Sequence, residues 1–199
     1  MEHTADSHGT VSYSAAFAIG IALNVIFIAA EIFYGFSSNS LSLVADAAHN
    51  VSDVAGLALA WGAAWLVTRA PTLRRTYGYR RSSILAAVAN ATLLLVAVGG
   101  ILFESVQRLL HPQPTAALTV IVVAAFGVLI NGVSALLFAR GREHDLNIRG
   151  AFVHMAADAG ISFGVICAAI IGRMTGLLWI DPAAGIAISL LVLFSAWGL

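Results

Sequence analysis

The sequence has no lysine, and its 199 residues include only one cysteine and four prolines. All of its positive charge comes from ten arginines, which ten acidic residues balance, so the net charge is zero. A neutral chain of this kind provides no basic field to attract nucleic acid, and we expect no nucleic-acid partner. The single cysteine, Cys167, excludes an internal disulfide.

The motifs of two kinds of membrane protease are also missing. A membrane metalloprotease would need H-E-x-x-H, and an intramembrane serine protease would need G-x-S-x-G or a comparable nucleophile turn. H-E-x-x-H does not occur in the sequence, and the one G-x-S-x-G match, at residues 160–164, lies inside an apolar span and not at a strand-to-helix nucleophile turn. The sequence therefore argues against an enzyme.

What the chain has in abundance is apolar sequence. Hydrophobic residues make up 60% of it and charged residues 10%, and the mean hydropathy is +0.91. The apolar residues form six runs close to the ~20 residues that a helix needs to cross a bilayer core of ~30 Å. We predict an all-α membrane protein, a single transmembrane domain built as a six-helix bundle. The predicted spans are 12–36, 41–67, 82–109, 115–139, 150–173 and 182–199.

The arginines predict the orientation of this bundle. Eight of them lie between spans two and three, or between four and five, and only two fall on the other side. Arginine-rich loops stay in the cytoplasm, and six spans return the chain to its starting side, so both termini are predicted to be cytoplasmic. The residues before span one lack the basic start and the cleavage site of a signal peptide. The arginines between spans are Arg69, Arg74, Arg75, Arg80, Arg81, Arg140, Arg142 and Arg149; those on the other side are Arg108 and Arg173.

Two related polar motifs lie inside the apolar spans. The stretch DAAHNVSD contains His49 and Asp53, and HMAAD contains His154 and Asp158. The i, i+4 spacing places each pair on one helix face. Burying even one ionisable group in a bilayer costs about 2.5–3.5 kcal/mol, so such groups pair, bind ions or line a wet cavity. Together the four side chains supply two nitrogen and two oxygen ligands, a set that suits tetrahedral Zn²⁺.

Alternatives remain open from the residues alone. Each histidine could bond only the aspartate of its own helix, without metal, or the pairs could relay protons in a proton-coupled carrier or channel. Asp46 lies on nearly the same helix face as Asp53. Its carboxylate could help to solvate an ion, or it could cap a helix. Glu31 and Glu104 could line an exit on the outer side.

The sequence resembles the cation diffusion facilitator family, which includes zinc transporters. The matching stretches are SLSLVADAAHNVSD, GYRRSSILAAVANA, DLNIRGAFVHMAADAGIS and IDPAAGIAISLLVLFSAWGL. The resemblance implies that His49, Asp53, His154 and Asp158 form the intramembrane metal site. It implies a homodimeric Zn²⁺/H⁺ antiporter that exports Zn²⁺. We expect it to work by alternating access, surrounded by lipid in a bacterial inner (plasma) membrane. The two-nitrogen, two-oxygen ligand set predicts that Co²⁺ or Cd²⁺ is also accepted.

The sequence also departs from the family pattern. Relatives commonly continue into a cytoplasmic metal-binding domain after the last span, whereas this sequence stops at SAWGL, so we expect that domain to be absent or truncated. The loop between spans four and five has one histidine, His144, where many eukaryotic members have several. Accessory metal sites are therefore not expected.

Overall fold

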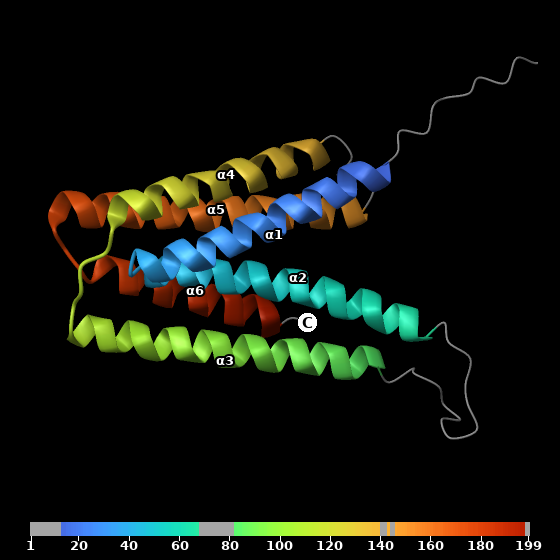
Figure 1. Cartoon of the computed structure of the whole chain (residues 1–199), viewed down its shortest axis with the longest axis horizontal. Coiled ribbons are helices and arrows are strands. Elements are labelled where there is room, and N and C mark those ends of the chain that lie inside the picture. The colour runs from blue at the N-terminus through green and yellow to red at the C-terminus, as the bar shows by residue number, and fades with distance from the viewer. Residues whose placement is uncertain (1–12, 68–81, 140–142, 144–145, 198–199) are drawn as a thin grey trace, which may run out of the picture.

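The computed structural model describes residues 13–67, 82–139, 143 and 146–197, and within them all regular structure is helical. The helices lie side by side with alternating direction (Figure 1). The prediction of an all-α protein is therefore confirmed. The six helices are α1 (Tyr13–Ser37), α2 (Leu41–Val67), α3 (Ser82–Leu110), α4 (Ala117–Phe138), α5 (Leu146–Thr175) and α6 (Ile180–Trp197).

Two helices begin earlier than the apolar spans that the sequence predicts. α5 begins at Leu146, four residues before the predicted span, and α6 begins at Ile180, two residues before it. The first turn of α6 therefore contains Asp181, which lies just before the predicted span, together with Pro182. Proline is tolerated there because the first N–H groups of a helix have no partner within the helix.

The surface of the bundle is suited to lipid. Three described stretches are long and apolar enough to cross a membrane, and two shorter apolar helices accompany them. Large aliphatic side chains such as Val96 and Leu137 are more than two-thirds exposed. An apolar exterior of this extent is expected in a bilayer and not in water. The chain is an integral membrane protein. The three long stretches are Ala87–Leu110, Ala117–Phe138 and Ile148–Thr175, and the shorter ones are Asn24–Ser37 and Ile180–Ser195.

The centre of the bundle is α2, which contacts α1, α3, α5 and α6, whereas α4 packs mainly on α5 (Figure 1). The core contains one or more buried aliphatic residues from each of the helices α2 to α6. α2 also contains His49 and Asp53, so the central helix carries half of the candidate ligands. Representative core residues are Leu43, Val98, Val120, Val165 and Val192.

Asp181 of α6 fixes the start of α2. Its carboxylate accepts hydrogen bonds of 2.6 Å from the Leu41 backbone N–H and from the hydroxyl groups of Ser40 and Ser42. It therefore satisfies N–H and hydroxyl donors at the start of α2, and its negative charge is favourable near a helix N-terminus. At Gly185, one turn along α6, a Cβ atom would lie 3.2 Å from the Leu41 backbone. The two helices are thus held together at this end.

The same end of the bundle contains the turn between α1 and α2. Asn39 adopts a left-handed backbone conformation there, with φ of 56°, which asparagine tolerates better than most residues. Arg108 of α3 donates a hydrogen bond to the Asn39 carbonyl oxygen at 2.7 Å and pairs with Glu104 at 3.0 Å. Glu104, considered above as an exit-lining residue, is therefore half-exposed and held in an ion pair.

Replacing Gly127 of α4 by alanine should destabilise the bundle. A Cβ atom at this position would lie 2.7 Å from the Ser162 hydroxyl and 2.9 Å from Phe27, closer than real contacts allow. Overpacking of this kind typically costs about 1–3 kcal/mol. Gly132→Ala on the same helix is the matched control, since its Cβ would meet nothing within 4 Å. Thermal unfolding in detergent should show a lower midpoint for Gly127→Ala only; equal midpoints would contradict the close packing.

Candidate metal centre

The four predicted ligands come together where α2 faces α5. His49 Nε2 lies 3.2 Å from Asp158 Oδ1, and His154 Nε2 lies 3.3 Å from Asp53 Oδ2. Within each helix the corresponding distances are longer, 3.7 Å for His49 to Asp53 and 3.6 Å for His154 to Asp158. Each histidine is thus closer to the aspartate of the other helix. This geometry favours one shared cluster over two separate pairs.

The cluster has an enclosed side and an open side. The His49 and Asp158 side chains are 12% and 4% exposed, whereas those of Asp53 and His154 are 30% and 43% exposed. Asp53 Oδ2 is itself buried and has no hydrogen-bond partner, although both imidazoles lie near it. A carboxylate oxygen of this kind, left without a donor, is available to a cation.

The donor atoms are close enough for one small cation. One ligand atom from each of His49, Asp53 and Asp158 lies within 4.8 Å of the others. The His154 ring centroid is 6.2 Å from that of His49, and its Nε2 atom is near both aspartates. Zinc–ligand bonds of ~2.0–2.2 Å to imidazole nitrogen and carboxylate oxygen would require only a small contraction of this group.

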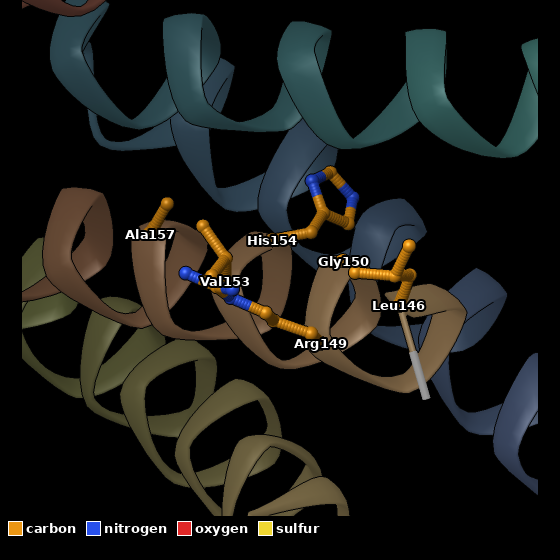
Figure 2. A pocket seen from close by; sticks show the side chains of 6 residues that line it. All are labelled: Leu146, Arg149, Gly150, Val153, His154 and Ala157. Atoms are coloured by element: carbon orange, nitrogen blue, oxygen red, sulfur yellow. The ribbon is translucent and has the colours of Figure 1, made fainter. Parts of the chain in front are cut away.

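Two cavities meet at His154. The larger, about 760 Å³, is bounded by the four polar side chains and by small residues of α5 and α6, among them Gly160 and Ala187. The second, about 570 Å³, lies along the first turns of α5 from Leu146 to Ala157. Figure 2 shows its lining, with the His154 ring extending from α5 toward α2. The candidate metal centre therefore adjoins a cavity at the end of the bundle where α5 begins.

A second polar cluster behind the centre was not predicted as a unit. Glu31 of α1 accepts a hydrogen bond from Asn50 Nδ2 at 2.8 Å, and Asp46 of α2 accepts one from Ser162 Oγ at 2.8 Å. Both carboxyl groups are fully buried. Glu31 therefore does not lie at an exposed exit, and Asp46 does not cap a helix. The i, i+4 spacing of Asp46 and Asn50 was the available signal, but it does not identify the partner helix.

Some candidate residues lie outside the described part of the chain. They are His3, His8 and His144, together with most of the arginines between the predicted spans. Of the arginines used for orientation, Arg108, Arg149 and Arg173 are described. Arg149 lies at the start of α5, and the other two lie in the last turns of α3 and α5.

Comparison with known proteins gives concordant results. The family model for the cation efflux transmembrane domain matches residues 17–199. The metal cation efflux system protein CzcD of Cupriavidus metallidurans is 39% identical over 179 residues, 90% of this chain and 57% of the relative. The zinc transporter ZitB of Escherichia coli K12 is 40% identical over 174 residues, 87% of this chain and 56% of the relative.

A third relative is named the cadmium, cobalt and zinc/H(+)-K(+) antiporter of Bacillus velezensis, which is 36% identical over 165 residues, 82% of this chain and 53% of the relative. The chain thus spans about half the length of these curated relatives. The family match covers nearly all of the chain, and the matched range includes all four predicted ligands. The chain therefore belongs to the cation diffusion facilitator family and contains its cation efflux transmembrane domain.

Proposed function

We propose that this chain is the membrane domain of a secondary active transporter that exports Zn²⁺ from the cytoplasm in exchange for protons. The observation that carries the proposal is the cross-helix cluster, in which each histidine lies nearer the aspartate of the other helix. A metal ion held between α2 and α5 joins two helices whose relative position must change during alternating access. The relative position of the two helices would then depend on whether the site holds the metal ion.

The ligand chemistry supports zinc as the cargo. Two imidazoles and two carboxylates supply four ligands without thiolates, and they neutralise the charge of a divalent ion. Four thiolates would give the soft, tight coordination of a structural site, which suits transport less well. The names of the relatives point the same way, since they mention zinc, cadmium, cobalt or metal cations. We propose Zn²⁺ as the main substrate, with Co²⁺ and Cd²⁺ accepted.

The proton is a natural counter-ion for this ligand set. Metal binding requires neutral imidazole and ionised carboxylate, so protons and metal compete for the same atoms. One relative's name includes H⁺ antiport. Protons arriving from outside would displace the metal and accompany the return of the carrier.

The membrane arrangement is part of the same proposal. We propose six crossings, with both termini and the start of α5 on the cytoplasmic side of a bacterial plasma membrane. The arginine distribution in the sequence supports this orientation. The cavity beside Arg149 and His154 would then open toward the cytoplasm, where Zn²⁺ enters. A homodimer, implied by the family resemblance, completes the assembly.

Purified protein in proteoliposomes should accumulate Zn²⁺ when an imposed pH gradient provides protons for exchange. Abolishing the gradient with an ionophore should reduce uptake to the level of empty liposomes, because the exchange loses its driving force. Zn²⁺ uptake that is indifferent to the gradient would contradict proton coupling. Proton flux without any Zn²⁺ binding would instead support the alternative in which the His/Asp pairs relay protons.

A further inference from the structure

Two fully buried carboxyl groups lie beside the metal centre without being part of it. Glu31 and Asp46 are both 0% exposed and interact electrostatically. Each uses one oxygen to accept a hydrogen bond, Glu31 from Asn50 and Asp46 from Ser162. The remaining oxygens, Glu31 Oε1 and Asp46 Oδ1, are buried and have no hydrogen-bond partner. Each carboxyl group therefore presents one unsatisfied oxygen in an enclosed space.

The surrounding charges do not neutralise this pair. The groups that interact with it electrostatically in the described part of the chain are His49 of α2 and Asp158 of α5, and His49 already pairs with Asp158. The α4 sequence contains no charged residue. Each uncompensated charge in a bilayer interior costs about 2.5–3.5 kcal/mol, and two adjacent carboxylates also repel each other. One shared proton removes one of the charges and satisfies the two free oxygens.

A metal ion does not suit this position. Neither of the two cavities at the metal centre is lined by Glu31 or Asp46. Calcium takes about 6–8 oxygen ligands, and magnesium usually keeps several waters, whereas only two free oxygens are present here. A proton needs no such space, because it lies within a hydrogen bond between the two carboxyl groups.

We propose that Glu31 and Asp46 form a proton-binding site, with one proton between the two carboxyl groups, and that Zn²⁺ binding at the neighbouring centre releases this proton. The O–H bond breaks heterolytically, so the pair gains one negative charge and the proton passes to water. Asp46 is one turn from His49 on α2, and its partner Ser162 is one turn from Asp158 on α5. Both helices of the metal centre therefore also hold the proton site. The transport part of this inference rests on the proposed function.

Infrared difference spectroscopy tests proton occupancy without measuring transport. The carbonyl stretch of a protonated carboxylic acid is separate from that of a carboxylate. Wild-type protein should show an acid band that disappears on adding Zn²⁺.

The isosteric variants Glu31→Gln and Asp46→Asn should each lack this band, so the test survives if one of them does not fold. Glu104→Gln, which alters a half-exposed glutamate in an ion pair, should keep it. An acid band unchanged in both Glu31→Gln and Asp46→Asn, or insensitive to Zn²⁺ in wild type, would overturn the proposal.

A coupled flux measurement tests what the proton does. The number of protons moved per Zn²⁺ should fall by one in Glu31→Gln and stay at the wild-type value in Glu104→Gln. Loss of a group that supports a metal ligand typically lowers metal affinity by roughly 10- to 100-fold. Zn²⁺ affinity in Glu31→Gln should change by less than this. An unchanged proton ratio would overturn the role in exchange. Wild-type protein that binds no Zn²⁺ would instead refute the proposed function, and the acid band would still decide whether the pair holds a proton.

Discussion

Asp53→Ala and Asp158→Ala should each weaken Zn²⁺ binding by roughly a hundredfold to a thousandfold and abolish vesicle flux. Zinc sites with four ligands bind with about 10–16 kcal/mol, so one ligand accounts for a quarter of that on average. Asp53 belongs to α2 and Asp158 to α5, yet each lies close to the histidine of the other helix. The remaining three side chains in either variant cannot complete a neutral four-ligand shell.

The double variant distinguishes one site from two. If both aspartates bind the same ion, Asp53→Ala combined with Asp158→Ala should cost much less than the sum of the single changes, because contacting groups are strongly non-additive. Isothermal titration of Zn²⁺ into the two single variants and the double variant gives the coupling directly. Gly132→Ala, which meets nothing within 4 Å, controls for substitution in the bundle. Additive losses would indicate two independent His/Asp pairs.

Metal selectivity should be the second large effect. Zn²⁺ should be transported readily, Co²⁺ and Cd²⁺ to a measurable extent, and Mg²⁺ and Ca²⁺ only at the level of empty vesicles. Two imidazoles at a compact site favour borderline-soft ions, whereas Mg²⁺ and Ca²⁺ require more oxygen ligands or retained water.

Competition in the same vesicles measures this selectivity. Excess Mg²⁺ should leave Zn²⁺ uptake unchanged, and excess Cd²⁺ should reduce it. Asp158→Ala protein is the control for uptake that does not use the site. Equal flux of Mg²⁺ and Zn²⁺ through wild-type protein would refute the assignment. A preference for Mn²⁺ would retain the site and change the substrate.

Local sequence patterns were sufficient to predict the helices. Long apolar runs separated by polar residues indicated six helices, and α2 has the same bounds as the predicted second span, 41–67. The starts of α5 and α6 differ because Arg149 and Asp181 look like loop residues in a hydropathy pattern. In the folded chain the Asp181 carboxylate binds donors at the start of α2, about 140 residues away. A pattern within one segment contains no information on such a distant partner.

For the candidate site, as for the fold, local patterns identified the residues but not their partners on other helices. The i, i+4 spacing shows that His49 and Asp53 share one helix face, but the choice between a local pair and a shared cluster depends on how α2 crosses α5. That crossing places each histidine nearer the distant aspartate. The pairing of Glu31 with Asp46 was missed for the same reason, since it arises from the packing of α1 on α2. Local spacing predicted which residues share a helix face, and the packing of the helices determined which residues from different helices lie together.

X-ray absorption at the zinc edge tests the central claim most directly, because it reports the atoms bound to the ion. The spectrum should be measured on Zn²⁺-loaded protein in which His3, His8, His111 and His144 are replaced, so that His49 and His154 are the only histidines. Two nitrogen and two oxygen ligands at ~2.0–2.2 Å are expected, with scattering from two imidazole rings. His49→Ala should remove one of those rings. A shell of six oxygens, or a sulfur ligand at ~2.3 Å, would contradict a metal centre built from His49, Asp53, His154 and Asp158.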